Sequence, residues 1–434
     1  MSILIIHLVC WVAATRTALV KVSKTMAASS TRRCTIPDGL SLRQCEVYQT
    51  LIHVAEGREE RGQGPRPIVV ISDVGKDYDD AAALLVLKEF HRLGHVELRA
   101  VVANLMPADK RTRLARAWLD ALGLQNVPVG RGTRGKPDEE EELELEYEFS
   151  WNDFVMPADV PQRDGQDLLL EAYQHAKAKG EKLYLLCLSS LQDIHKFASA
   201  YPDLVAHYTA EVHMQGGNYI SSEGKLEPDR SAANNRYNWE AARAWHSFLQ
   251  KNALPSYTYT KAVAFAAALS SEVFVELEAS GHPIGSYLRR VQVEQDLAFY
   301  KQACESDPEK RFAPFMDQQW FLVHKTNWQQ RPNADLGAGL PIGEEVIPYL
   351  SKIVLYDVHG ALGVSGEDVI EKLGIFRSRD RSIEVELKST GKVVRVHHWI
   401  ADDEQSVAVP DKVHAVLSAL LKGSLLDALR YSNL

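Results

Sequence analysis

Short apolar runs alternate along the chain with longer segments in which apolar residues recur at helical spacing. The first run, IVVI at residues 68–71, has the length and β-branching of a buried strand, and an Ala/Leu-rich helical segment follows it. The expected order is strand 68–71, helix 79–93, strand 96–103, helix 107–122, strand 127–129, helix 166–179, strand 183–187, a helix after 189–190, strand 210–214, helix 239–249, strand 256–260, a hairpin of 382–387 with 393–399, and helix 411–421. Strands separated by helices pair in parallel. The pattern therefore predicts an α/β fold with an open, mostly parallel, doubly wound sheet flanked by helices.

The chain divides into a leading part and one large domain. Residues 1–36 are interpreted as a leader or disordered extension, and 37–65 as an N-terminal extension and linker. Residues 66–434 then form one α/β domain, with an acidic insertion at 137–149 and a C-terminal extension at 330–434. We interpret the acidic insertion as a solvated loop, because runs of like charge repel one another and stay in water.

The N-terminal residues leave the localisation open. Residues 3–14 are apolar, but no basic residue precedes them and the run is too short for an ordinary membrane span. Residues 16–33 are basic and rich in Ser, Thr and Ala, which suits an organelle transit peptide; translation from Met26 is a further alternative. Five isolated cysteines without a CxxC pair favour a reducing compartment. A cytoplasmic protein is thus favoured, with a secretory or organelle leader as the alternative.

Composition excludes several classes of protein. With 45% hydrophobic and 25% charged residues the chain is typical of a globular protein rather than a disordered one. Its formal net charge of −9 lacks the basic footprint of a general nucleic-acid binder. We therefore expect no nucleic-acid partner, and no membrane because the apolar run is too short to span one; the charge leaves a small-molecule partner open.

A carboxylate cluster is the most informative feature. The eight residues 73–80, DVGKDYDD, place four carboxylates between the end of the first strand and the start of the first helix. Ligands of doubly wound folds bind at the carboxyl ends of strands, and Gly75 permits a tight turn there. Converging carboxylates repel each other without a cation and are hard oxygen ligands that suit Ca²⁺ or Mg²⁺. In the alternative, Asp79 and Asp80 only cap the helix and Asp77 is solvated.

At this motif the sequence resembles the inosine/uridine-preferring nucleoside hydrolase family, as a divergent member. The family begins with a strand that runs into an Asp-rich loop of the DxDxGxDD type or a longer form. Across residues 66–325 further segments are similar to family motifs in the family's order: VVAN at 101–104, SSLQD at 189–193, MQGGN at 214–218, AANN at 232–235 with EAA at 240–242, and FMDQ at 315–318. The set is considerably more specific than the opening motif alone.

The resemblance implies a function and a set of site residues. The activity would be metal-dependent hydrolysis of the N-glycosidic bond of a ribonucleoside to free base and ribose, in an enzyme that is a possible homo-oligomer. One Ca²⁺ would be held by Asp73, Asp80, Asp317 and the backbone carbonyl of Gln192, and the catalytic Asp73 would take a proton from the metal-bound water. Substrate-binding residues would be Asp79 and Asn234 or Asn235, which would hold ribose hydroxyls, with Asn104 and Asp77 nearby.

Three positions depart from the family pattern. Ile71 stands where an Asp is common, Ala232 where a Glu usually helps to bind the sugar, and Met316 where many members have a His that assists base departure. These departures motivate an alternative function, a catalytically impaired nucleoside or sugar binding protein on the same fold. A metal-dependent phosphohydrolase is a third hypothesis, motivated by the Asp cluster alone.

Other polar segments were weighed against this set. Asp357, in the segment YDVH at 356–359, is a second late carboxylate, but spacing favours Asp317, so Asp357 is interpreted as a strand-end or cap residue. Arg111 shares a helix with Lys110, Arg113 and Arg116, and we interpret this group as a solvated face. Tyr237, Tyr257 and Trp239 are interpreted as core or rim residues rather than base-stacking ones.

Overall fold

The computed structural model describes residues 35–137, 161–330, 339–377, 382–387, 392–401 and 409–432. The predicted leader, apart from its last two residues, and the acidic insertion, apart from its first, lie outside this range. Throughout the part of the chain that is described, no helix is both long enough and apolar enough to cross a membrane.

Nine strands of the described residues form one central sheet, in the order β12-β13-β9-β6-β5-β1-β2-β3-β4. Their bounds are β1 Arg66–Ser72, β2 Val96–Ala103, β3 Val129–Arg131, β4 Arg163–Asp164, β5 Leu183–Cys187, β6 Thr209–Gln215, β9 Ser256–Tyr259, β12 Ser382–Leu387 and β13 Lys392–Ala401. All neighbours pair in parallel except β12 with β13, which form the antiparallel hairpin that the sequence predicts. The predicted open, mostly parallel α/β sheet is confirmed.

The strand order reverses direction at the centre of the sheet. From β1, the chain proceeds outward through β2, β3 and β4 on one side, and through β5, β6 and β9 on the other. A doubly wound sheet leaves a crevice beyond the carboxyl ends of its strands at such a switch point. The end of β1, where the carboxylate motif begins, is therefore the expected ligand position in this topology.

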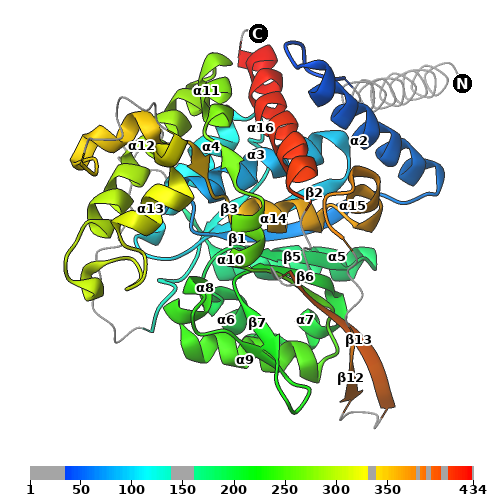
Figure 1. The fold of residues 1–434 in the computed structure, drawn as a ribbon. Coiled ribbons are helices and arrows are strands. Elements are labelled where there is room, and N and C mark those ends of the chain that lie inside the picture. Colours follow the sequence, from blue (N-terminus) through cyan, green and yellow to red (C-terminus); the bar gives the residue numbers. More distant parts are fainter. Residues whose placement is uncertain are drawn as a thin grey trace, which may run out of the picture.

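Two apolar layers sandwich the sheet, and β1 is therefore buried on both faces. Ile68 and Val70 belong to one core cluster and Val69 and Ile71 to the other, as alternation along a strand requires. The first face is covered by helices α3 Tyr78–Leu93, α4 Ala108–Ala121, α14 Asp357–Val364, α15 Glu367–Leu373 and α16 Pro410–Ser432, and the second by α5 Gly165–Lys179, α6 Gln192–Ala200, α7 Pro202–Tyr208 and α9 Trp239–Lys251. Figure 1 shows the two layers above and below the sheet.

A long N-terminal helix, α2 Leu42–Glu60, lies beside α16, so the two ends of the described chain pack together (Figure 1). A capping box of Ser41 and Gln44 starts α2. The sequence interpretation of residues 37–65 as extension and linker did not include this helix.

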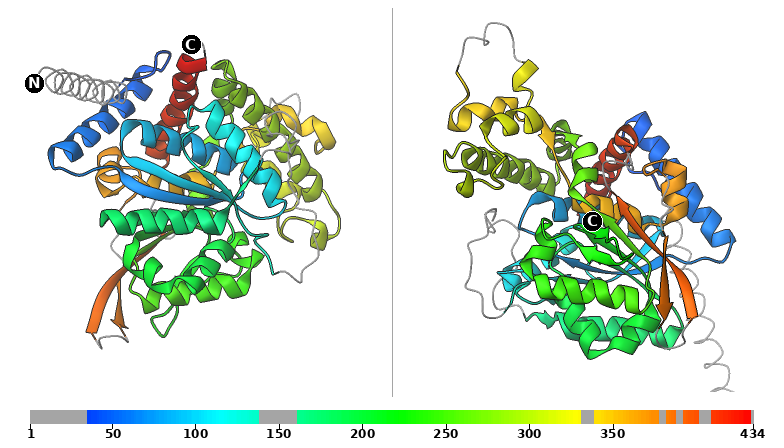
Figure 2. Two further views of the ribbon diagram at one scale, coloured as in Figure 1. Left: turned by 180° about the vertical axis from the view of Figure 1, so that it is seen from behind. Right: turned by 60° about the horizontal axis from the view of Figure 1, so that its bottom comes forward.

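A smaller helical lobe stands to one side of the sheet, formed by α12 Pro283–Ala303, α13 Gln318–Lys325 and the 3-10 helix η5 Gly343–Tyr349. It has its own apolar cluster, which includes Tyr300, Phe321 and Trp328. The right-hand view of Figure 2 shows this lobe projecting from the main body. The remaining described helices are α8 Ala233–Tyr237, α10 Lys261–Ala266 and α11 Glu272–Ala279, with η2 Pro308–Lys310 and η3 Trp328–Gln330; short strand pairs are β7 Asn218–Ile220 with β8 Leu226–Pro228 and β10 Leu269–Ser270 with β11 Lys352–Ile353.

Candidate functional site at the end of the central strand

The β1–α3 loop brings the motif carboxylates to one place. Asp73 follows the last residue of β1, and Gly75 takes a φ of 92°, the left-handed conformation that favours glycine. The loop then reaches Asp77, which stands at the N-cap of α3 but makes no side-chain capping bond. Asp79 and Asp80 occupy the first turn of the helix, whose positive dipole end favours negative charge.

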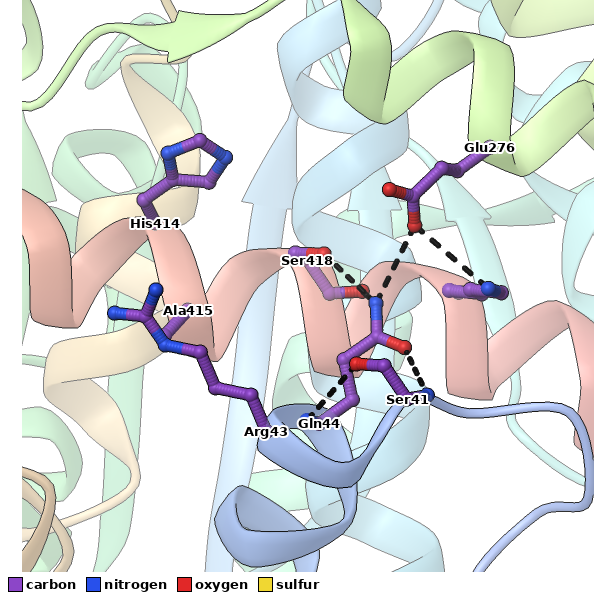
Figure 3. Close-up of a pocket in the computed structure, with 8 residues that line it drawn as sticks. Ser41, Arg43, Gln44, Glu276, His414, Ala415 and Ser418 are labelled. Carbon is purple, nitrogen blue, oxygen red and sulfur yellow. Dashed lines mark hydrogen bonds and ion pairs between the residues drawn. The ribbon is translucent and has the colours of Figure 1, made fainter.

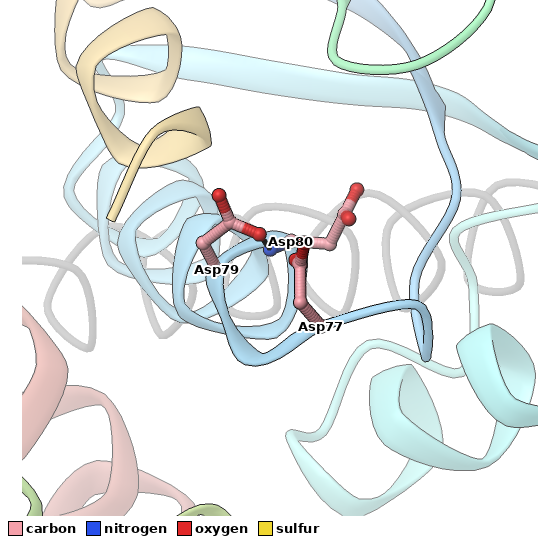
Figure 4. A group of neighbouring side chains, drawn as sticks. All are labelled: Asp77, Asp79 and Asp80. Atoms are coloured by element: carbon pink, nitrogen blue, oxygen red, sulfur yellow. Dashed lines mark hydrogen bonds between the residues drawn. The ribbon is translucent and has the colours of Figure 1, made fainter. Parts of the chain in front are cut away.

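Three of these side chains form a compact group. Carboxylate oxygens of Asp77, Asp79 and Asp80 lie within 4.8 Å of one another (Figure 4). Ser72 donates its hydroxyl to Asp80 at 2.5 Å, and the backbone N–H of Asp80 donates to Asp79 Oδ1 at 3.0 Å. Oδ1 of Asp77 is buried and has no hydrogen-bond partner among the described residues. A buried carboxylate oxygen without a donor can accept a ligand, which can be a cation or a hydrogen-bond donor such as a hydroxyl group.

Asp357 is the late carboxylate that joins this group, in place of the expected Asp317. Asp357 is buried at the start of α14, and its carboxyl group lies within hydrogen-bonding reach of that of Asp80. Asp317 instead caps α13, with its Oδ1 accepting a bond from the backbone N–H of Trp320 at 2.8 Å. The structure thus places Asp317 at a helix cap and Asp357 in the carboxylate cluster.

The chain also fastens α14 to the motif through its backbone. The N–H of Tyr356 donates to Asp79 Oδ2 at 3.0 Å, which places the residue before Asp357 directly against the first turn of α3. The residue before Asp357 is thus a Tyr whose backbone holds α14 against the carboxylate loop.

Crowding of buried carboxylates raises their pKa values. For Asp79, Asp80 and Asp357 burial is the largest cause, and repulsion by the neighbouring aspartates adds to it. Burial also raises the pKa of Asp73, while the positive charges of Lys76 and Arg111 oppose the rise. Without a cation the cluster is thus electrostatically unfavourable.

Arg111 is a buried clamp, which corrects the interpretation of its helix as a wholly solvated face. Its side chain is fully buried, and its guanidinium donates to the backbone carbonyls of Leu105, Met106 and Asp73, the last at 2.9 Å. It therefore joins the loops that follow β1 and β2. Helical spacing could have separated Arg111 from Arg113 and Arg116, because Arg111 shares the face of the buried Leu114 and Trp118.

Asn104 and Gln192 lie at the ends of β2 and β5, on the same edge of the sheet. Asn104 is fully buried and donates its Nδ2 to the carbonyl of Ser190 at 3.0 Å and to Asp193 at 2.7 Å. Gln192 begins α6. In each residue the side-chain oxygen is buried and finds no hydrogen-bond partner in the described structure.

Asp193 is a residue that the sequence reasoning missed. It is fully buried, and its carboxylate accepts bonds from Asn104, from the backbone and hydroxyl of Thr133, and from Gln166. These bonds tie together the loops after β2, β3 and β5. Asp193 is therefore a structural anchor of the edge of the sheet on which the carboxylates lie.

The two asparagines of α8 are buried and held by backbone groups. Asn234 donates its Nδ2 to the carbonyls of Leu188 and Gln215, and Asn235 donates to those of Gly217 and Asp229. Their amide N–H groups are thus engaged within the protein. What each side chain can still offer a ligand is its amide oxygen.

Tyr237, three residues further on, reaches the carboxylate loop. The ammonium of Lys76 lies 5.3 Å from the centre of the Tyr237 ring, within hydrogen-bonding reach of the Tyr237 hydroxyl. Tyr257 instead stacks on His213 at 4.7 Å between ring centres, inside the fold. Of the aromatic residues weighed from the sequence, Tyr237 is thus the one beside the cluster.

A pocket of about 230 Å³ lies away from the carboxylates, between α2, α11 and α16 (Figure 3). Gln44 donates to Ser418 at 2.8 Å and to Glu276 at 3.4 Å across it, and Lys422 lies 3.7 Å from Glu276. These bonds close the seam between the first and last described helices. We assign the pocket to that seam and not to the candidate site.

Comparison with solved structures follows this geometry. The type III effector protein XopQ, solved in complex with adenosine diphosphate ribose, matches 89% of this chain and 99% of its own, with a TM-score of 0.68 at 22% identity. A purine-preferring ribonucleoside hydrolase from Gardnerella vaginalis matches 84% of this chain and 100% of its own, with a TM-score of 0.51 at 14% identity. The plant nucleoside hydrolase PpNRh1 matches 82% and 99%, with a TM-score of 0.52 at 12% identity. The chain has the nucleoside-hydrolase fold.

No protein-family model matches the chain, and no curated protein matches it. The solved structures nevertheless confirm, for the fold, the likeness to nucleoside hydrolases that the motifs suggest. On this nucleoside-hydrolase fold the residues present suit a hard divalent cation, because they offer several buried carboxylates close together.

Proposed function

We propose that this chain hydrolyses the N-glycosidic bond of a ribonucleoside, or of a closely related ribosyl compound, with the help of Ca²⁺. The observation that carries the proposal is the convergence of five buried or half-buried aspartates at the switch point of a nucleoside-hydrolase fold. An arrangement with this much repulsion persists when it serves a ligand, since a surface loop would relax by exposing its charges to water.

Asp73, Asp80 and Asp357 are the residues that would hold the cation, together with the backbone carbonyl of Gln192. This set replaces Asp317 with Asp357, because the carboxyl group of Asp357 lies beside that of Asp80 whereas Asp317 caps α13. A bound divalent cation would neutralise the carboxylates and lower the pKa of water at the site.

Asp73 is the proposed general base, because it follows the central strand directly and is buried beside Asp80. Its carboxylate would take a proton from the attacking water. Cleavage of an N-glycosidic bond passes through a sugar with oxocarbenium character, and surrounding carboxylates stabilise that positive charge. The cluster therefore offers both the base and the electrostatic stabilisation that the reaction needs.

Asp79, Asp77 and the amide oxygens of Asn104, Asn234 and Asn235 are the proposed ribose contacts. The free oxygens of Asp77 and Asn104 are buried without donors in the described structure, and sugar hydroxyls are donors of the right kind. We expect hydroxyl groups to satisfy them when substrate binds.

A binding protein that does not turn over its ligand is the second candidate. The observations that favour it are Ala232 at the position of the usual sugar-binding Glu and Tyr356, not a His, before the late carboxylate. XopQ, whose solved structure holds adenosine diphosphate ribose, also supports testing ribosyl ligands other than nucleosides.

The deciding experiment is a panel of purine, pyrimidine and nicotinamide ribosides assayed for base release by chromatography, with Ca²⁺ and with EDTA. We expect release from at least one riboside in Ca²⁺, and none in EDTA or from the Asp73→Asn variant. Calorimetry with the same ribosides and with adenosine diphosphate ribose gives the binding constants. Binding without base release would select the second candidate, and neither binding nor release would reject both.

A further inference from the structure

A lysine lies inside the carboxylate loop. The side chain of Lys76 is only 19% exposed, and its Nζ lies 3.9 Å from Asp77 Oδ2. On its other side the ammonium faces the ring of Tyr237, a residue of α8. A positive charge is therefore fixed between the motif loop and a helix from another part of the chain.

The ammonium keeps its charge in this position. Burial alone would lower the pKa of Lys76, but Tyr237, Asp77 and Asp73 together outweigh burial and hold the pKa well above its ordinary value. The effect is reciprocal, because Lys76 opposes the rise of the Asp73 pKa that burial causes.

Arg111, the other positive side chain that acts on Asp73, has a different role. Its guanidinium donates to backbone carbonyls, including that of Asp73 at 2.9 Å, and so holds loops together. Lys76 reaches a carboxylate side chain instead, and its mobile four-carbon stem carries a compact charge. The loop thus contains one positive group that can act as a counter-ion.

We propose that Lys76 is a tethered counter-ion of the carboxylate cluster, one that competes with the divalent cation for the field of the aspartates. This inference rests on the cation site of the proposed function. The ammonium offsets part of the repulsion between Asp73 and Asp77 when no cation is bound, and it repels a divalent cation that enters the same field. It therefore stabilises the cation-free protein and weakens cation binding at once.

The contacts of Lys76 favour this role over that of a ligand for an anionic substrate. Asp77 and Tyr237 already engage the ammonium from two sides. A substrate anion would have to displace these contacts and approach five aspartates.

Calorimetric titration of the chelator-treated full chain with CaCl₂ tests the proposal. We expect Lys76→Met to bind Ca²⁺ about tenfold more tightly than the wild type, from the Coulomb repulsion between a single and a double charge several ångströms apart. In EDTA the same variant should unfold at a lower temperature than the wild type, and saturating Ca²⁺ should raise its Tm by more.

Three further variants make the result decisive. Lys76→Gln removes the charge but keeps a polar group for Tyr237, so it repeats the test if the Met variant misfolds. Lys76→Arg keeps the charge and should bind Ca²⁺ within about twofold of the wild type. Lys225→Met removes an exposed lysine paired with Glu223 and should change nothing.

The outcomes separate the inference from the function beneath it. Equal or weaker Ca²⁺ binding by both Lys76→Met and Lys76→Gln overturns the role of Lys76 while leaving the cation site intact. Failure of the wild type to bind Ca²⁺ contradicts the cation site itself, and the inference falls with it.

Discussion

Burial makes the aspartates of this cluster different from ordinary surface carboxylates. Asp73, Asp79, Asp80 and Asp357 are each less than 5% exposed, and burial is the largest cause of the rise in each of their pKa values. Under the proposed function, removal of Asp80 or Asp357 has opposite effects in the two states of the protein. It relieves repulsion when no cation is bound and removes a ligand when one is.

Asp357 and Asp317 give a matched pair for testing the site. Under the proposed function, Asp357→Asn should lower kcat/KM for the best riboside by about 100-fold or more, because a carboxylate beside the cation is lost. Asp317→Asn should leave kcat/KM within a few-fold and cost at most about 1 kcal/mol of stability, because Asn also caps helices well. Steady-state kinetics and urea unfolding of both variants make the comparison. A large kinetic loss in Asp317→Asn alone would restore the original assignment.

The motif carboxylates could be predicted from the sequence because they are local. Asp73 and Asp80 are separated by one turn and the start of a helix, so the strand end and Gly75 determine their approach. The late carboxylate depends on how a distant helix packs. Spacing along the chain favoured Asp317, but the intervening lobe of α12 and α13 carries Asp317 into a cap position.

At the scale of elements, α3 connects the site with the rest of the protein. Its first turn carries Asp79 and Asp80, and its later turns carry Lys88 and Glu89, both nearly fully buried. Lys88 donates to Glu89 at 2.7 Å and to Asp427 of α16 at 2.5 Å. A buried charge network thus holds the helix whose other end presents the carboxylates.

Lys88→Met should destabilise the protein by about 3 kcal/mol, because it leaves the buried Asp427 without its main partner. The double variant Lys88→Met/Asp427→Leu should recover part of this loss, since Glu89 keeps its pair with Arg92 at 2.6 Å. Urea unfolding monitored by circular dichroism gives both free energies. The exposed-lysine variant Lys225→Met serves as the control, and a double variant no more stable than Lys88→Met would contradict the network.

The order of the central strands from β1 to β9 followed from the hydrophobic pattern, because strands such as β1 and β2 are short apolar runs followed by helices of clear periodicity. Other features did not follow from it, including the helices α10 to α15 between residues 261 and 373, where the pattern predicted no element. The helix α2 has many charged positions and a weak apolar face, so residues 42–60 resembled an extension. Arg111 was interpreted as a surface residue because of its charge, although helical spacing places it on the face of the buried Leu114 and Trp118.

At the scale of the whole molecule, the sheet places the site at its centre while the ends of the described chain close the far side. The cores on both faces of β1 hold this strand rigidly. Helices α2 and α16 pack over α3, the helix that follows β1. The molecule can therefore keep repelling carboxylates close together, because burial of the two large apolar cores outweighs the unfavourable free energy of that repulsion.

Global stability in EDTA should depend on pH through this cluster. The pKa values of Asp73, Asp79, Asp80 and Asp357 are raised in the folded state. Their contribution is therefore fully present below the unfolded pKa of about 4 and is lost as pH rises through the folded values. Buried histidines act oppositely between pH 4 and 6.5, because the pKa of His246 and His359 is lowered to about 4.

The Asp357→Asn variant isolates the carboxylate effect, because the histidine contribution cancels when variant and wild type are compared at each pH. In EDTA the variant should equal the wild type in Tm near pH 4 and become progressively more stable than it as the pH rises toward 8. In saturating Ca²⁺ at neutral pH the order should reverse, because the wild type then gains more from the cation. Thermal unfolding at a series of pH values provides the measurement. A difference in Tm that stays constant with pH in EDTA would show that Asp357 does not belong to a repulsive cluster.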